Sequence, residues 1–275
     1  MHPFLFRLGG FTLHSYGLCM AIGILCAFAV LQKLASARGY HAERLSTLTT
    51  ILVFSGIAGA RLAYVLEHWN DYAGDWLGVF RIWEGGLMFY GSILLGGIVL
   101  ALLCRFMKYP AFALLDLYAV VVPIGQIFGR IGCLLNGCCF GHPSDSWCAI
   151  AYPSGSYVSS LYGGAPVLPS QLFESAGCLF LFLLLLALYR ALYRIPETPA
   201  STPILPKCGT GLVLAGYCVG YGILRSIVET TRGDPRLALG PLSIAQAISV
   251  GGFILAIAIV LTLPLRRPKE TRKAP

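Results

Sequence analysis

The stretch AVVVPIGQIFGRIGCLLNGCCFG, residues 119–141, places a permanent charge and three thiols directly behind an apolar run. Residues 119–128 carry no charge, and Arg130 follows almost at once. A helix needs about 20 mainly apolar residues to cross the hydrocarbon core of a bilayer, and an arginine there must face protein or water. The stretch therefore predicts a membrane-spanning helix that ends at a polar site.

The composition extends this prediction to the whole chain. Hydrophobic residues make up 57% of the 275 residues and charged residues only 12%, a balance typical of membrane proteins. The net charge of +8 comes from basic residues in short blocks such as RRPKETRK, residues 266–273. Such blocks indicate a cytoplasmic membrane face and not a nucleic-acid surface, so we predict no nucleic-acid partner.

Apolar runs of spanning length predict an all-α integral membrane protein with about seven transmembrane helices. The first run is too long and too weakly basic at its flank for a cleaved signal peptide, so we predict that it is retained. The predicted spans are residues 13–32, 47–66, 86–104, 111–130, 170–189, 209–228 and 240–264.

The connections between these spans alternate in charge. Those after the first, third and fifth spans, and the C-terminal tail, are basic, whereas the others are acidic, aromatic or turn-rich. Basic loops stay in the cytoplasm, which predicts an N-terminus outside and a C-terminus inside. We expect residues 1–275 to form a single polytopic domain with an outward-facing loop region at about 131–169.

Several charged residues fall in or at the ends of the spans, where lipid does not tolerate them unpaired. Tyr221, Arg225 and Glu229 recur every four residues and so share one helical face, with Arg232 one turn further on. One interpretation is that Arg225 and Glu229 neutralise each other and fix helix packing. The other adds Arg130 from a different helix, because two guanidinium forks suit a lipid phosphodiester. The remaining charges of this kind are Arg61, Asp116 and Glu174.

Small residues and tyrosines also allow two interpretations. The glycines of FSGIAGARLAY and WEGGLMFYGSILLGGI permit tight helix packing or break a helix beside a polar cavity. Tyr16 and Tyr90 lie near the outer ends of their spans, either in the interfacial aromatic belt or as hydrogen-bond donors in a site.

The order of these motifs resembles the prolipoprotein diacylglyceryl transferase family over nearly the whole chain. The similar stretches are SYGL, GARLAYVLEH, RIWEGGLMFYGS, GRIGCLLNG, LPSQLFES, GYGILRSIVETTRGD and LSIAQAIS. The resemblance implies transfer of the diacylglyceryl group of phosphatidylglycerol to the lipobox cysteine thiol of a preprolipoprotein, with a thioether as product. It also implies a multi-pass protein of the bacterial cytoplasmic (inner) membrane, with membrane lipid and the lipobox peptide as partners and no cofactor.

The resemblance also implies roles for individual residues. Arg130 and Arg225 match the family's essential arginines, and they suit binding of the phosphate that leaves. Tyr221 is implied to orient the headgroup, Tyr16 to line the cavity, and Glu229 to hold an arginine. The catalytic residues predicted are Arg130, Arg225, Tyr221 and Tyr90, and the substrate-binding residues predicted are Tyr16, Arg61, Gly91, Asn136, Glu229 and Arg232.

Three positions depart from the family's usual pattern. Cys133 stands in place of Asn, Cys138 in place of Glu and Tyr90 in place of His. A tyrosine with an ordinary pKa of about 10 is a poor base at neutral pH. Either the arginines lower the pKa of the incoming thiol, or Tyr90 relays a hydrogen bond, or the chain performs a related transfer.

The clustered cysteines admit three interpretations. A metal site of Cys133, Cys138, Cys139, His142 and Cys148 matches no standard zinc spacing, so we predict no metal. A disulfide from Cys138 or Cys139 to Cys148 would staple the outer loop, and buried free thiols are the third possibility. A nucleophilic cysteine is not required, because the substrate brings the thiol.

Two other functions compete with the transferase. A small membrane transporter could use the same buried arginines, although the chain shows no repeat between its halves. An inactive or divergent lipid-binding paralogue would account for the changes at Tyr90, Cys133 and Cys138.

Overall fold

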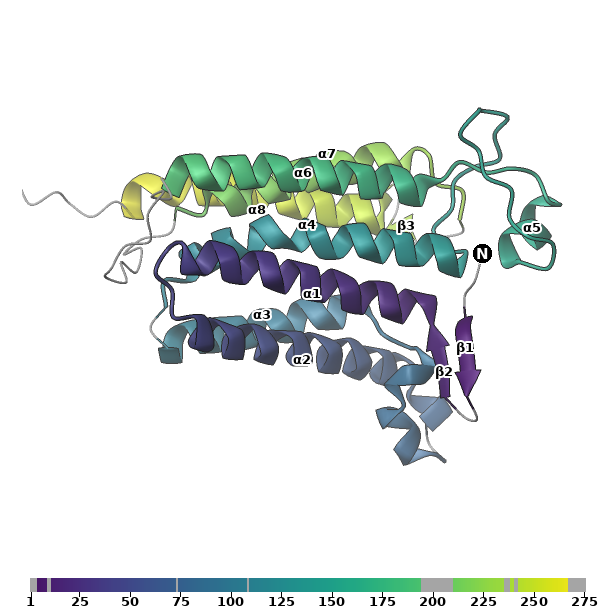
Figure 1. Ribbon diagram of the computed structural model, residues 1–275, viewed down its shortest axis with the longest axis horizontal. Helices are drawn as coiled ribbons and strands as arrows, with labels where there is room; N and C mark the ends of the chain where they lie inside the picture. Colours follow the sequence, from purple (N-terminus) through teal and green to yellow (C-terminus); the bar gives the residue numbers. More distant parts are fainter. Residues whose placement is uncertain are drawn as a thin grey trace, which may run out of the picture. The chain divides into compact units, whose positions relative to one another are not determined.

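Seven long helices dominate the computed structural model, which describes residues 4–8, 11–72, 74–107, 109–193, 210–234, 238–239 and 242–266 (Figure 1). All seven are long and apolar enough to cross a membrane, which confirms the seven predicted spans. They are α1 (Ser15–Ser36), α2 (Ala42–Glu67), α3 (Phe89–Met107), α4 (Ala111–Asn136), α6 (Ser170–Tyr193), α7 (Leu212–Glu229) and α8 (Ile244–Arg266).

Short elements connect the long helices, and none of them was predicted from the sequence. The antiparallel hairpin of β1 (Phe4–Leu8) and β2 (Phe11–His14) precedes α1. The 3₁₀ turns η1 (Trp69–Tyr72), η2 (Trp76–Phe80) and η3 (Ile82–Glu84) link α2 to α3. The other short elements are α5 (Tyr157–Tyr162) and the small hairpin of β3 (Ala238–Leu239) and β4 (Leu242–Ser243).

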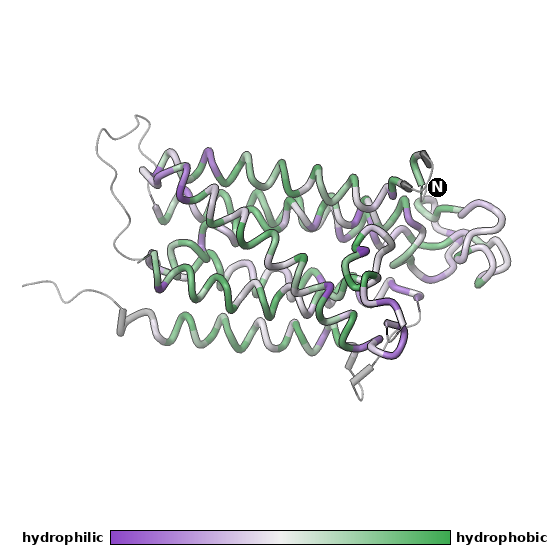
Figure 2. The backbone as a smooth tube through the Cα atoms, turned by 90° about the horizontal axis from the view of Figure 1, so that it is seen from below, coloured by the Kyte–Doolittle hydropathy of each residue, from purple (hydrophilic) through white to green (hydrophobic). Residues whose placement is uncertain are grey.

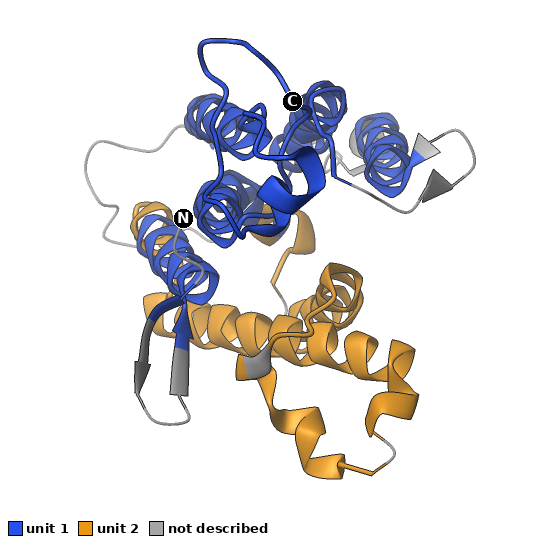
Figure 3. Cartoon of the chain, turned by 90° about the vertical axis from the view of Figure 1, so that its right-hand side faces the viewer, with its two compact units in different colours: residues 1–31, 115–195, 209–275 blue, residues 32–114, 196–208 orange. Residues whose placement is uncertain are grey.

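The chain divides into two compact units, which the sequence did not predict (Figure 3). Unit 1 comprises residues 1–31, 115–195 and 209–275, and unit 2 comprises residues 32–114 and 196–208. The prediction of a single membrane domain therefore stays a prediction, as does the orientation of the helices. Much of the basic connection after α6 and most of the C-terminal tail, on which the orientation partly rests, lie outside the described residues.

Large apolar side chains cover the outer surfaces of the helices. Leu25 of α1 is 68% exposed, Leu94 of α3 is 68% exposed and Phe180 of α6 is 69% exposed. In water such exposure would be costly, whereas in lipid the apolar surface is already in its preferred solvent. The green, apolar stretches run along most of each helix in Figure 2.

Glycines bring α2 and α3 together in unit 2. A Cβ atom on Gly59 would collide with the carbonyl oxygen of Gly91, and a Cβ atom on Gly91 would collide with that of Gly59. Two backbones can approach this closely only where both residues lack a side chain. Tight packing, one of the two interpretations of these glycine runs, is thus confirmed at this pair.

A buried carboxylate in unit 1 anchors the beginning of α7. Asp116 of α4 is fully buried and accepts hydrogen bonds from the amides of Gly211, at 2.8 Å, and Leu214, at 2.9 Å. The hydroxyl groups of Tyr193 and Thr210 also donate to it. An acidic group suits the free amides and the positive end of a helix N-terminus, so Asp116 has a structural role.

Candidate active site

Three long helices of unit 1 meet at a buried polar cluster. Arg130 of α4 pairs with Glu174 of α6 at 3.0 Å, and the hydroxyl of Tyr221 on α7 donates to the same carboxylate at 2.9 Å. The Glu174 side chain is only 1% exposed, against 21% for Arg130. Four residues before Arg130, Gln126 donates to the hydroxyl of Tyr217 at 2.9 Å. Glu174 therefore holds both Arg130 and Tyr221 in position.

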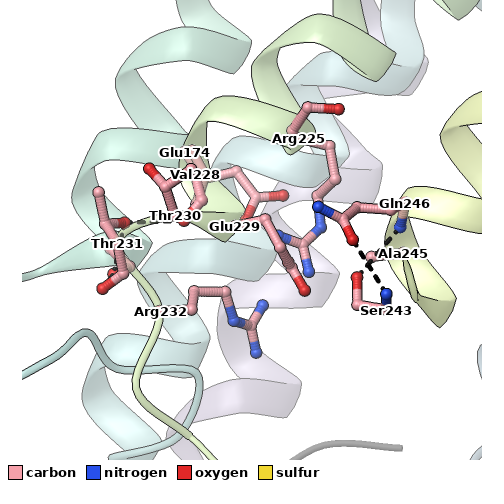
Figure 4. A network of polar contacts seen from close by, with 12 residues as sticks. Glu174, Arg225, Val228, Glu229, Thr230, Thr231, Arg232, Ser243, Ala245 and Gln246 are labelled. Atoms are coloured by element: carbon pink, nitrogen blue, oxygen red, sulfur yellow. Dashed lines mark hydrogen bonds and ion pairs between the residues drawn. The ribbon is translucent and has the colours of Figure 1, made fainter. Parts of the chain in front are cut away.

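A second arginine lies along α7, one helical turn beyond Tyr221. The Nη1 atom of Arg225 meets Glu229 Oε2 at 2.7 Å, as an ion pair without the alignment of a hydrogen bond. Figure 4 shows Arg225 and Glu229 near the end of α7, with Gln246 of α8 to their right in the view and Glu174 of α6 to their left. Glu229 therefore contacts Arg225, as the resemblance implies. The same contact also fits the other interpretation, in which the two residues neutralise each other and fix helix packing.

Arg232 does not continue the helical face, contrary to the prediction. Because α7 ends at Glu229, Arg232 lies in the following segment, where it pairs with Gly141 in a β-bridge. Its Nε and Nη2 atoms donate to both oxygens of Asp234, at 3.0 and 2.7 Å. Burial lowers the pKa of Arg232, but the hydrogen bonds to Asp234 and the negative charges of Cys139 and Asp234 together raise it above its ordinary value, so the group stays charged.

The two helical arginines keep donors for a ligand. A guanidinium offers five N–H donors, and the carboxylates of Glu174 and Glu229 use only part of this capacity at Arg130 and Arg225. Each pair is neutral, which reduces the cost of burying the charges in an apolar surrounding. An anion with several oxygens, such as a phosphodiester, could bridge the remaining donors.

Tyr16 stands at the beginning of α1, against the helix that carries Arg130. A Cβ atom on Gly132 would lie 3.0 Å from Cδ2 of the Tyr16 ring, so the glycine makes room for this tyrosine. Tyr16 is 40% exposed. The structure thus brings Tyr16 and Arg130 into one unit, whereas the role of Tyr16 in substrate binding stays a prediction.

A turn at the end of α4 folds the cysteines back on the helix. The amide of Gly137 donates to Leu134 O at 3.3 Å and the amide of Cys138 donates to Cys133 O at 3.1 Å, the pattern of a Schellman motif. Gly137 has a φ of 75°, in the left-handed region that such a turn needs at this position. The helix therefore runs six residues further than the predicted span, and its last turn lies in what was predicted as loop.

This turn brings three thiols together. The Sγ atoms of Cys133, Cys138 and Cys139 all lie within 4.8 Å of one another. Cys148 is a free thiol, as are Cys138 and Cys139, so the disulfide to Cys148, one of the three interpretations of these cysteines, is not formed. The pKa of Cys139 lies far below that of an ordinary thiol, because the neighbouring thiols of Cys133 and Cys138 and the positive charges of Arg232 and Arg130 favour its thiolate.

The loop after the turn is tied to α6 and to the segment after α7. The amide of Gly141 donates to Leu168 O at 2.9 Å, and the amide of Gly233 donates to Phe140 O at 3.1 Å. A Cβ atom on Gly141 would lie 2.6 Å from Leu168 O, so only glycine fits. Gln171, also buried, donates to Cys138 O at 2.7 Å.

Three further predicted residues are divided between the two units: Asn136 lies in unit 1, and Tyr90 and Gly91 lie in unit 2. Asn136 is exposed and donates a long hydrogen bond, 3.7 Å, to Cys138 Sγ. Tyr90, 52% exposed, and Gly91 lie in the first turn of α3 in unit 2. Their predicted roles, Tyr90 in catalysis and Asn136 and Gly91 in substrate binding, stay predictions.

Arg61 of α2 has a different set of partners. Its guanidinium donates to the carbonyl oxygens of Gly78, at 2.7 Å, Val79, at 2.8 Å, and Gly85, at 2.7 Å. A further bond reaches Gly86 O at 3.2 Å. These bonds use its donors to hold the η2–η3 segment, so the geometry favours a structural role over the predicted substrate binding.

Sequence reasoning missed several residues of the cluster. Glu174 was noted only as a charge within a span, because the sequence alone does not name its partners on α4 and α7. Gln171 and Gly141 gave no signal, since their roles depend on contacts with Cys138 and Leu168. The position of Glu174 near the beginning of an apolar helix was the only feature of the sequence that pointed to a polar cluster.

Comparison with known proteins places this arrangement in a family. The profile of the prolipoprotein diacylglyceryl transferases matches residues 3–262. A phosphatidylglycerol–prolipoprotein diacylglyceryl transferase of Synechocystis sp. is 33% identical over 263 residues, 96% of this chain and 89% of its own length. The second such transferase of Clostridium perfringens is 32% identical over 262 residues, 95% of each chain. With seven candidate spans and a match over nearly its full length, the chain belongs to the prolipoprotein diacylglyceryl transferase family.

Proposed function

We propose that this protein transfers the diacylglyceryl group of phosphatidylglycerol to the lipobox cysteine of a preprolipoprotein. The observation that carries the proposal is the buried cluster in which Glu174 joins Arg130 to Tyr221, with Arg225 one turn further along α7. Relatives named phosphatidylglycerol–prolipoprotein diacylglyceryl transferases match over nearly the whole chain. The substrates follow from the relatives, and the chemistry of the cluster fits them.

The reaction is a substitution at a glycerol carbon. The thiolate sulfur of the peptide forms a bond to this carbon, the carbon–oxygen bond to phosphate breaks, and glycerol phosphate leaves with the electron pair. Negative charge grows on the leaving oxygen, and preorganised donors stabilise such charge most where water is excluded. Arg130 and Arg225 would bind the phosphate, and Tyr221 would orient it.

The proton of the incoming thiol needs a separate route. A guanidinium cannot accept it, because arginine has no acceptor atom, and Glu174 already accepts from Arg130 and Tyr221. The arginines could still lower the pKa of the thiol through their charge, and Tyr90 could relay a hydrogen bond. A third route is binding of the thiol as a thiolate by a positively charged group near the arginines.

The proposed function also implies a cellular localisation and a membrane topology. A multi-pass member of this family that acts on preprolipoproteins would sit in the bacterial cytoplasmic membrane as one domain. Its N-terminus and the loop after α4 would face outward and its C-terminus the cytoplasm, because the basic connections lie at the opposite ends of the helices.

The test is direct transfer by the purified protein in vesicles of phosphatidylglycerol. A lipobox peptide should gain the mass of a diacylglyceryl group, and the same peptide with Ser in place of Cys should not. Vesicles of phosphatidylethanolamine serve as the lipid control. A folded protein that binds phosphatidylglycerol and transfers nothing would support the inactive lipid-binding paralogue instead.

A further inference from the structure

Three cysteine side chains form a compact cluster beside the arginines. The Sγ atoms of Cys133, Cys138 and Cys139 lie within 4.8 Å of one another, and Cys133 is three residues from Arg130. Zinc–sulfur bonds of about 2.3 Å in tetrahedral geometry place sulfurs about 3.8 Å apart. Movements of about 1 Å or less would therefore bring the three thiols to the spacing of ligands on one metal ion.

The backbone holds these thiols together. The Schellman turn sets Cys138 beside Cys133, and the Gln171 side chain fixes the carbonyl group of Cys138. Cys139 has a φ of 61°, the single positive value among the non-glycine residues of the described chain. This conformation is strained for a residue with a side chain, and such strain gathers at functional sites.

We propose that Cys133, Cys138 and Cys139 bind one soft divalent cation of the zinc class, whose fourth position takes the thiol of the incoming peptide. Three protein ligands and one open position are the pattern of catalytic zinc sites. The second half of the proposal rests on the proposed transferase function, whereas the metal site does not. His142 and Cys148, weighed from the sequence as further ligands, lie outside the group of three thiols that the described residues form.

The charges around the cluster suit this ion. Three thiolates and a divalent cation carry a net charge of −1, and the positive charges of Arg130 and Arg232 act on Cys139. Cys138 and Cys139 are partly exposed, so an ion and a fourth ligand have access. The site differs in this respect from buried structural cysteines such as Cys178.

The bound ion would remove the need for a protein base. A thiol on such an ion loses its proton, which passes to water. The resulting thiolate sulfur then bonds to the glycerol carbon as glycerol phosphate leaves with the electron pair, and the metal keeps its oxidation state. A free thiol with a pKa of about 8.5 is only about 3% thiolate at pH 7, so full deprotonation raises the reactive fraction by about 30-fold.

Cobalt titration tests the metal site on the full chain in detergent micelles, reduced and stripped of metal. We expect one Co²⁺ per chain with thiolate charge-transfer absorption, displaced by Zn²⁺. Cys133→Ser and Cys139→Ser should lose this absorption, and Cys148→Ser, a free thiol of the same loop, should keep it. No absorption in the wild type, or full absorption in both cluster variants, would overturn the proposal.

Alkylation provides a measurement that needs no variant. Zn²⁺ should protect Cys133, Cys138 and Cys139 of the wild-type protein from iodoacetamide, as counted by mass spectrometry of peptides, and should leave Cys148 reactive. Equal labelling of the cluster with and without Zn²⁺ would contradict the site even if the serine variants fail to fold.

Addition of the lipobox peptide tests the fourth position. The peptide should change the spectrum of the Co²⁺-loaded protein, and the peptide with Ser in place of Cys should not. Transfer should fall by about 30-fold on metal removal and return with Zn²⁺. Unchanged transfer without metal would refute binding of the peptide thiol to the metal but not the transferase function. Metal binding without any transfer would support the metal site and refute the transferase function.

Discussion

Arg61 and Arg130 both place a guanidinium within a candidate membrane span, yet their surroundings differ completely. Arg61 donates to four backbone carbonyl groups of the segment that follows its own helix. Arg130 instead forms an ion pair with the Glu174 side chain, which also accepts a hydrogen bond from Tyr221. An intramembrane arginine is therefore no sign of a ligand site by itself, and what matters is how many donors the protein leaves unused.

The largest effect is expected from Arg130→Ala, which should reduce transfer by about 100-fold or more, because it removes donors from the leaving phosphate. This variant also leaves Glu174 buried without its cation, so Arg130→Lys is the cleaner test. Lysine keeps the charge but lacks the planar fork, and most of the transfer should still be lost. Peptide transfer in phosphatidylglycerol vesicles measures both.

Arg190→Ala is the matched control, because Arg190 is exposed at the other end of α6. It should change neither transfer nor stability. Full activity of Arg130→Lys would contradict a bidentate phosphate contact and reduce Arg130 to a packing residue like Arg61.

Arg61→Ala should lower stability and not primarily activity. Its loss leaves the carbonyl group of Gly78, which is buried, without that donor, at a cost of about 1–3 kcal/mol, and removes further bonds to the less buried carbonyl groups of Val79 and Gly85. Thermal unfolding in detergent should show a clear fall in Tm. If the variant keeps its Tm but loses phosphatidylglycerol affinity, the substrate binding predicted from the sequence is right after all.

Tyr221→Phe should have a smaller effect, because Arg130 still holds Glu174 when the phenol is removed. One lost hydrogen bond to a charged group corresponds to about 1.5–3 kcal/mol, and the lower end of this range predicts a fall in transfer of about tenfold. Tyr217→Phe is the matched control four residues earlier, where the hydroxyl group accepts from Gln126. Equal losses in both variants would point to packing of α7 and not to the phosphate.

The smallest effect is expected from Ser243→Ala at the beginning of α8. Ser243 and Gln246 form a capping box, in which the Gln246 amide donates to Ser243 Oγ at 3.2 Å and the Ser243 amide donates to Gln246 Oε1 at 3.0 Å. Loss of the cap should cost about 1 kcal/mol, seen as a small fall in Tm. A large loss of transfer would instead draw Gln246, close to Arg225 in Figure 4, into the site.

The spans could be predicted from the sequence because lipid imposes a simple rule of length and polarity. Their ends could not, as at the last turn of α4, where Asn136 and Gly137 end the helix through local hydrogen bonds. The hairpin before α1 gave no alternating pattern strong enough to notice. Helix ends and short hairpins depend on a few local hydrogen bonds, which cannot be inferred from the hydropathy of the sequence.

Only the relations between site residues on the same helix could be predicted from the sequence. The spacing of Tyr221, Arg225 and Glu229 showed a shared face, and the last two do pair. Contacts between helices, such as Arg130 with Glu174, depend on packing that no spacing reveals. The sequence also left the state of the cysteines open, because it does not show that the turn at Gly137 brings Cys138 and Cys139 to Cys133.

The anchor at Asp116 sets the axial register of the whole of α7. Leu214, which Asp116 holds, and Arg225 are separated by about 17 Å along the helix axis, at 1.5 Å for each residue. A slip of a single residue would translate Arg225 by about 1.5 Å and rotate it by about 100°. A carboxylate at the beginning of α7 thus fixes the position of a guanidinium near the end of the same helix, and one alanine inserted between Leu214 and Tyr221 would displace the proposed phosphate contact without altering the contacting residues.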